Sequence, residues 1–350
     1  MNGQSTRNTP LIHCFLSVIL LVSACAKEKP LSGSPIFVSI LPQAYFVERI
    51  LGSENGGRVE VMVGPGQSPT TYEPTPQQMM KLTNTKLYFA IGVPFEHIWI
   101  DRIKATNPNL IIIDTSKGTA KRDIEHAGYT SDTTHHTRKD PHIWLDPILV
   151  KAQARIMAQA LAETEPGHTA EYQANLKAFL EDLDRLDLEI KAILKDLESR
   201  TFFVFHPSWG YFADRYGLRQ VPVEVGGKEP GARGLGRFVE EAKTLIHQGG
   251  AARVLFVQKQ FSTKTAETVA RSIGARIVTL DPLAKDYLSN LRNTALVIME
   301  CGVRNAECGM RSAECGARTS SLHFNIPLLS LSSLDISLSE DSCTTELNQA

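Results

Sequence analysis

Short apolar runs alternate with amphipathic stretches from about residue 35 to residue 299. The apolar runs are IFVSI, VEVMVG, KLYFAIG and LIIIDT in the first half, then TFFVFH, QVPVEV, RVLFVQ and RIVTL. Runs of this length, rich in β-branched and aromatic residues, predict strands. The stretches between them, such as QAYFVERIL and PFEHIWIDRI, have the apolar spacing of helices. This alternation predicts an α/β fold with an N-terminal lobe at 35–167 and a C-terminal lobe at 199–299.

One long helix is expected to connect the two lobes. No Gly or Pro occurs between His168 and Leu197, and leucine, isoleucine and phenylalanine recur there at steps of three and four residues. This spacing predicts a helix at 168–198 of about 40 Å, at 1.5 Å per residue. Such a connector is rigid, so we do not expect large domain closure.

The N-terminal residues resemble an export signal. The apolar run at 11–22 is too short to span a bilayer, and it follows Arg7 and precedes small residues. These features are typical of a secretory signal peptide, placed here at 1–24. The protein is therefore expected outside the cytoplasm.

Cys25 closes the sequence VSAC, which resembles a bacterial lipobox. Cleavage before Cys25 would leave this residue to carry a lipid, with 25–34 as a tether to the membrane. The alternative is ordinary signal cleavage near Ala24 or Ala26, with Cys25 incidental.

The last fifty residues have an unusual composition. Residues 300–318 read ECGVRNA, ECGMRSA and ECGAR, which repeats a glycine-containing unit with little apolar content. A heptad seam or a soft-metal site is conceivable, but this composition favours a disordered tail at 300–350. No cysteine lies between Cys25 and Cys301, which excludes a thiolate zinc site or a disulfide there.

Charge narrows the class of partner. The chain has 37 basic and 38 acidic residues. It has no excess of positive charge to hold a polyanion, so no nucleic-acid partner is expected.

Three separate segments each contain a potential metal ligand. His142 lies in DPHIWLDP, His206 in FVFHPSWGYFADRYGL and Asp281 in IVTLDPL. Two imidazoles and one carboxylate suit zinc or manganese. His206 and Asp281 also end predicted strands, where open α/β sheets bind their ligands. Taken singly, the three have plainer interpretations as a loop histidine, a strand-end cap and a helix N-cap.

These segments occur with SILPQAYFVERILG, VGPGQSPTTYEPTPQQM, EVGGKEP, FVQKQFSTKTAETVA and TLDPLAKDYLSNLR. Together they make residues 35–299 resemble the zinc and manganese receptors of bacterial ABC importers, the TroA-like solute-binding protein family 9. The resemblance implies two Rossmann-like lobes, a rigid spanning helix and a metal site in the inter-lobe cleft, with His142, His206 and Asp281 at ligand positions. It also implies a monomer in the periplasm or at the cell surface that delivers the ion to a membrane permease with its ATPase.

One ligand position departs from the family pattern. The motif usually begins Pro-His, and here Thr70 follows Pro69, so the first histidine is replaced by a poor zinc ligand. Water, Glu73, or a histidine of the following loop, His135 or His136, could fill the place. A solvated loop is the alternative interpretation of this histidine pair.

Three function classes remain at this point. The first is a receptor whose cargo is Zn(II), with Mn(II) second because zinc binds more tightly to such ligand sets. The second is a metal-binding surface adhesin with the same fold, which the resemblance also allows. The third is a zinc hydrolase, which would need Glu73 or Glu224 as general base and lacks a metalloprotease HExxH motif.

Overall fold

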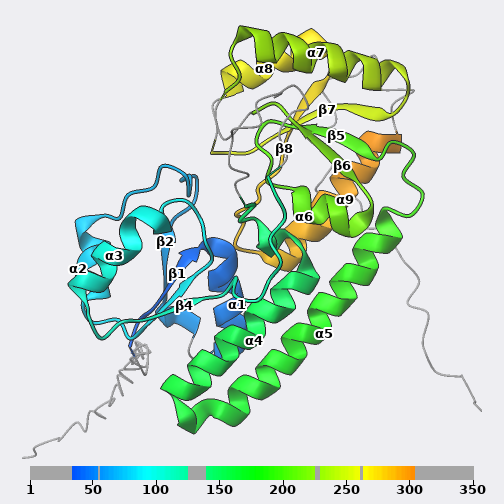
Figure 1. Ribbon diagram of the computed structural model, residues 1–350. Helices are drawn as coiled ribbons and strands as arrows, with labels where there is room; N and C mark the ends of the chain where they lie inside the picture. The colour runs from blue at the N-terminus through cyan, green and yellow to red at the C-terminus, as the bar shows by residue number, and fades with distance from the viewer. Residues whose placement is uncertain (1–33, 54–55, 125–138, 225–228, 261–262, 304–350) are drawn as a thin grey trace, which may run out of the picture. The chain divides into compact units, whose positions relative to one another are not determined.

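Two four-stranded parallel sheets organise the computed structural model (Figure 1), which describes residues 34–53, 56–124, 139–224, 229–260 and 263–303. The first sheet has the order β2-β1-β3-β4 and the second the order β6-β5-β7-β8. The strands are β1 (Ile36–Ile40), β2 (Val59–Val63), β3 (Leu87–Ala90), β4 (Ile111–Asp114), β5 (Thr201–Val204), β6 (Arg219–Pro222), β7 (Ala251–Val257) and β8 (Arg276–Thr279). Every apolar run that was predicted to be a strand forms a strand. The two sheets have the same strand topology, with the second strand of each lobe at one edge and the fourth at the other. The two expected Rossmann-like lobes are confirmed.

Helices cover both faces of each sheet. In the first lobe, α1 packs on β1 and β2, and α2 packs with α3; in the second, α7 and α8 pack on β7, as does α9. The helices are α1 (Leu41–Leu51), α2 (Pro76–Leu82), α3 (Glu96–Thr106), α4 (Pro147–Thr164), α5 (Thr169–Ile193), α6 (Gly210–Tyr216), α7 (Ala232–His247), α8 (Thr263–Ile273) and α9 (Tyr287–Val303), with 3-10 turns η1 (Gly56–Arg58), η2 (Ile143–Leu145) and η3 (Pro166–His168).

The long connecting helix is α5, and it does not stand alone. It lies alongside α4 and also packs on α1 of the first lobe and α9 of the second (Figure 1). The start of α4 is fixed by Asp146, whose Oδ1 accepts a hydrogen bond from the backbone N of Ile148 at 2.7 Å, and by Pro147 in the first turn. The connector is therefore a helix pair, of which only the second member was predicted as one long helix.

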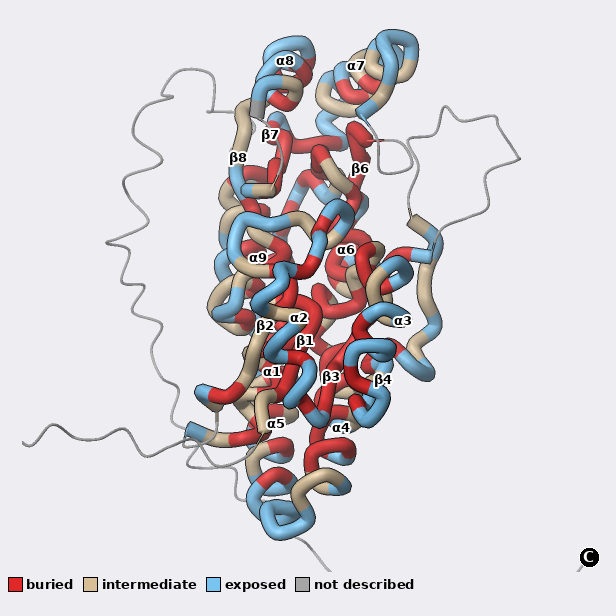
Figure 2. Tube along the Cα trace, turned by 90° about the vertical axis from the view of Figure 1, so that its left-hand side faces the viewer, coloured by how far each residue is buried: buried red, intermediate tan, exposed pale blue. Residues whose placement is uncertain are grey.

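Apolar side chains alternate between the two faces of the second sheet. Phe202 and Phe256 belong to the large core shared with the first lobe, whereas Phe203 and Leu255 join a separate cluster with α7 and α8. This is the two-residue period expected of strands covered on both faces. Figure 2 shows the central strands β1, β3 and β7 as mostly buried, whereas the edge strands β4 and β8 are intermediate to exposed and α7 and α8 expose their outer sides.

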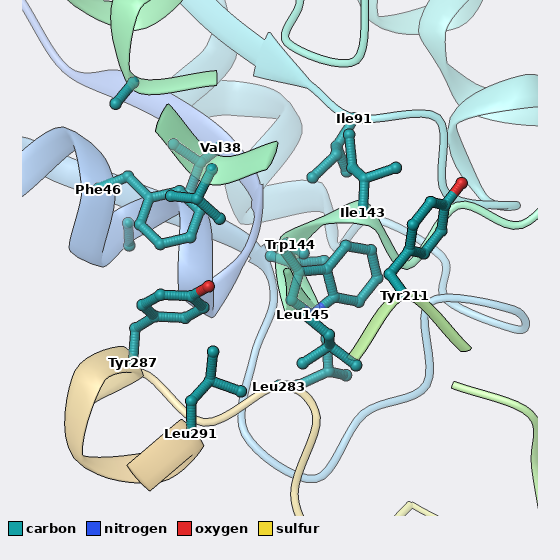
Figure 3. Close-up of a cluster of buried hydrophobic side chains, with 14 of the residues drawn as sticks. Val38, Phe46, Ile91, Ile143, Trp144, Leu145, Tyr211, Leu283, Tyr287 and Leu291 are labelled. Atoms are coloured by element: carbon teal, nitrogen blue, oxygen red, sulfur yellow. The ribbon is translucent and has the colours of Figure 1, made fainter. Parts of the chain in front are cut away.

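The large core continues from one lobe into the other (Figure 3). Tyr287 of α9 packs its ring edge-on against Phe46 of α1, with ring centroids 4.8 Å apart. Trp144, in η2, donates a hydrogen bond from Nε1 to the carbonyl oxygen of Pro282 at 2.7 Å. Because moving the lobes apart would expose these side chains to water, the packing opposes a wide opening.

The second lobe extends further than expected. Helix α9 runs to Val303 instead of ending at Met299, and Cys301 is buried at 7% exposure. Cys301 accepts a hydrogen bond at Sγ from Arg276, and Gly302 lies where an added Cβ would overlap Leu197. The first ECGV of the repeat is thus helical, because its small residues fit against the fold.

Several expectations concern other parts of the chain. The signal, Cys25 with its tether, and the tail from residue 304 lie outside the described residues. Within the part that the structure describes, no helix is both long and apolar enough to cross a membrane.

Candidate metal centre

The structure brings His142 and His206 together. His142 immediately precedes η2 in the segment between β4 and α4, and His206 lies two residues beyond the end of β5. Their ring centroids are 5.4 Å apart with planes at 75°. Both line a small cavity of about 70 Å³, and Thr70 lines it as well. Three positions that sequence analysis selected from distant segments therefore share one cavity.

Each imidazole is fixed by a buried carboxylate. Nδ1 of His142 lies 2.6 Å from Oδ1 of Asp140, and Nδ1 of His206 lies 2.6 Å from Oε2 of Glu224. Asp140 is 0% exposed and Glu224 is 3% exposed. Because an ionised carboxylate only accepts, each Nδ1 carries the proton and donates it. Each Nε2 is then left with its lone pair, as a divalent metal requires.

Short-range geometry places both carboxylates. The backbone N of His142 donates to the same Asp140 Oδ1 at 2.9 Å, so the side chain closes a tight turn around its own loop. Glu224 follows β6, and its backbone N donates to the carbonyl of Phe205 at 3.0 Å. This bond extends the pairing of β5 with β6, so parallel pairing itself sets Glu224 beside His206.

Asp281 lies next to the cavity with its carboxylate already engaged. Oδ1 accepts from the backbone N of Leu283 at 3.0 Å and from Nε2 of Gln260 at 3.4 Å. Oδ2 lies 3.8 Å from Nζ of Lys259. Pro282 and Leu283 line the cavity, whereas Asp281 is not among its lining residues. Across the described residues, no group of three or more His, Cys, Asp or Glu side chains is placed to share one ion.

The loop that carries Thr70 is held against the cavity by contacts with the β3–α3 connection. The backbone N of Phe95 donates to the carbonyl of Pro69 at 3.0 Å, and the Tyr72 and Phe95 rings pack edge-on with centroids 5.2 Å apart. Glu73 is exposed and is not a lining residue of the cavity. Of the positions considered for the missing ligand, Thr70 itself is therefore at the cavity and Glu73 is not.

His135 and His136 lie outside the described residues. Ahead of that gap, Ile124 forms part of the cavity wall, and beyond it Pro141 does. Asp123 and Lys139 form an antiparallel bridge that joins the two sides of the gap. The described residues Ile124 and Pro141, on either side of this segment in the sequence, therefore both line the cavity.

Sequence analysis missed the role of the two carboxylates. Asp140 was not among the candidate residues. Its place two residues before His142 lets its carboxylate bond both the backbone N and the imidazole of that residue, and this short spacing was the available signal. Glu224 was considered only as a catalytic base. It lies 18 residues from His206, and only the pairing of their strands shows that the two side chains meet.

Known zinc-uptake proteins are similar to this chain in sequence and in fold. The zinc-uptake protein of Bacillus subtilis is 25% identical over 292 residues, which is 78% of this chain and 88% of that protein. Its counterpart in Yersinia pestis is 26% identical over 80% of this chain and 96% of that protein. A crystal structure of a ZnuA deletion mutant with zinc bound superposes with a TM-score of 0.70 at 42% identity, covering 77% of this chain and 98% of that one.

A family model described as "Zinc-uptake complex component A periplasmic" matches residues 36–301. That region contains both sheets, α5 and the two histidines with their carboxylates. The chain therefore belongs to the family of periplasmic zinc-uptake complex component A.

Proposed function

We propose that this protein is the extracytoplasmic receptor that captures Zn(II) and delivers it to the permease of an ABC importer driven by its ATPase. The observation that carries the proposal is the pair of imidazoles at one cavity, each held at Nδ1 by a buried carboxylate. This arrangement presets both Nε2 atoms as ligands before the ion arrives. The relatives named high-affinity zinc uptake system protein ZnuA support zinc as the cargo.

The ligand set follows from the same geometry. We assign His142 and His206 as the two nitrogen ligands and Asp281 as the oxygen ligand. Asp281 would bind by turning its carboxylate away from Gln260 and Lys259 toward the cavity. Water beside Thr70 would complete the four-coordinate geometry that zinc prefers. Manganese, which binds such sets more weakly, is the second candidate cargo.

Catalysis is not part of this function, because the family is a transport component. In addition, neither glutamate that could serve a zinc hydrolase as general base, Glu224 or Glu73, is available for that role. The carboxylate of Glu224 is bonded to Nδ1 of His206, and Glu73 is exposed away from the cavity lining. Neither is positioned to take a proton from a metal-bound water.

Anchoring at the membrane is a further element of the proposal. The family is periplasmic, and the VSAC sequence supports a lipid on Cys25 with residues 25–34 as the tether of a monomeric receptor. Replacing Cys25 with serine should release soluble protein from membranes. A Cys25→Ser product that stays membrane-bound and lipid-labelled would contradict the proposed lipid anchor. It would not bear on the proposal that the protein binds zinc.

Metal binding to the purified, metal-stripped protein tests the central proposal. After zinc is added, native mass spectrometry should find one zinc ion per chain. In competition, zinc should displace manganese. His206→Ala should abolish tight binding. His168→Ala is the matched control, because that imidazole is 46% exposed and contacts Glu171 and Tyr172 at the start of α5. Wild-type affinity in His206→Ala would show that the ion binds elsewhere.

A further inference from the structure

A cation faces the carboxylate that holds His142. Nη1 of Arg122 lies 3.7 Å from Oδ2 of Asp140, and Oδ1 of the same carboxylate bonds the imidazole. The Asp140 side chain is 0% exposed and that of Arg122 is 18% exposed. A carboxylate removed from water to this extent is costly unless hydrogen bonds and opposite charge compensate it. His142 supplies the hydrogen bonds at Oδ1, and Arg122 supplies positive charge on the Oδ2 side.

The same arginine reaches the segment that follows His206. Nε of Arg122 lies 2.9 Å from Oδ2 of Asp214 on α6, and its guanidinium carbon lies 5.9 Å from the centre of the Tyr211 ring. The phenol of Tyr211 accepts from the backbone N of Arg122 at 3.1 Å and donates to the carbonyl of Asp140 at 2.9 Å. Burial raises the pKa of Tyr211 to about 12, so its hydroxyl keeps the proton that it donates.

Gly210 leaves the space that the guanidinium occupies. A Cβ added at Gly210 would overlap Nη1 of Arg122 and would lie 3.0 Å from Oδ2 of Asp140. Gly210 is the first residue of α6, so this close approach brings the segment after His206 against the carboxylate behind His142. The overlap involves the tip of a flexible side chain, and an added methyl group would therefore displace the guanidinium before it disturbs the backbone.

We propose that Arg122 is a positioning residue of the metal site, which fixes Asp140 and thereby the orientation of His142 without touching the ion. The contacts to Asp214 and Tyr211 hold the guanidinium in place, and Gly210 provides its room. This inference rests on the proposed function in one respect, that His142 is a ligand. Arg122 would thus contribute to zinc affinity indirectly, by holding Asp140 and with it His142 in place.

Zinc titration of variants of the full chain, against a chromophoric chelator, tests the assignment. Arg122→Gln should weaken zinc binding by about tenfold to a hundredfold, the range for losing a partner of a metal ligand. Arg122→Lys should recover part of this loss, because it restores the charge without the planar fork. Arg219→Gln is the control, since that arginine pairs with Glu241 at 3.5 Å on the far side of the second sheet.

Two further readouts separate positioning from general stability. The visible bands of the Co(II)-loaded protein should change in Arg122→Gln, because His142 is reoriented, and should be kept in Arg219→Gln. Gly210→Ala should also weaken zinc binding, and combining it with Arg122→Gln should add little, because both act by removing the guanidinium. If Arg122→Gln does not fold, as judged by circular dichroism, Gly210→Ala decides by itself.

The outcomes are distinct. Zinc affinity within about threefold of wild type together with unchanged Co(II) bands in Arg122→Gln would overturn the inference. Fully additive losses in the double variant would do the same. Failure of the wild-type protein to bind zinc, or full affinity in His142→Ala, would instead overturn the proposed function.

Discussion

Replacing Glu224 with glutamine should weaken zinc binding while leaving the fold intact. The carboxylate is 3% exposed and lies 2.6 Å from Nδ1 of His206, with its oxygen Oε2 as the acceptor. Glutamine has nearly the same shape and can place its amide oxygen at the same point. The substitution therefore removes the negative charge and keeps the hydrogen bond.

The size of the effect follows from the kind of bond that is lost. A hydrogen bond to a charged group contributes about 1.5–3 kcal/mol and one between neutral groups about 0.5–1.5 kcal/mol. The difference, about 1–1.5 kcal/mol, corresponds to about tenfold in affinity. It acts mainly on the loaded state, because an ion on Nε2 draws electron density from the ring and makes Nδ1–H a stronger donor.

Competition with a chromophoric chelator at neutral pH would measure this change. Glu240→Gln is the matched control, since it makes the same chemical change at an exposed position of α7. We expect about a tenfold loss for Glu224→Gln and no loss for the control. Equal zinc affinities in the two variants, both folded, would refute the idea that this carboxylate strengthens the ligand.

Three other predictions concern Thr70, the ion pair between Arg58 and Glu165, and the last turn of α9. Thr70→His should tighten zinc binding by about tenfold or more and favour zinc over manganese; unchanged affinity in a competition titration would mean that the fourth position is already filled or faces elsewhere. The hydrogen bond from Arg58 lowers the pKa of Glu165, so this pair stabilises the fold above the ordinary glutamate value of 4.5 and ceases to do so as the pH falls through the lower value in the folded state. Urea unfolding of Glu165→Gln should therefore show a loss of about 1–2 kcal/mol at neutral pH, since solvent reaches part of the carboxylate, and a loss that does not shrink in acid would contradict the assignment. Truncation after Val303 should leave the melting temperature unchanged, whereas truncation after Met299 should lower it by about 3 °C or more, and equal melting temperatures would show that the last turn of α9 contributes nothing.

The amino-acid sequence by itself indicated the strands, the long helix α5 and the residue types of the candidate metal site. Each strand was visible as an apolar run and α5 as an uninterrupted helical repeat, because these periodicities are properties of neighbouring residues. His142 and His206 were selected as candidate ligands from their local motifs and from the resemblance of residues 35–299 to a metal-receptor family. The end of α9 was misjudged, because nothing local shows that Cys301 is buried and that Gly302 lies against Leu197.

Only the tertiary structure decided what surrounds the two histidines. Glu224 reaches His206 because β5 and β6 pair in parallel and end at the same edge of the sheet. Arg122 reaches Asp140 because α6 begins with a glycine that leaves room for a guanidinium. These contacts join residues whose separation along the chain exceeds any local pattern. Charge, burial and distance decide such contacts, and they are defined only once the sheets and helices have packed.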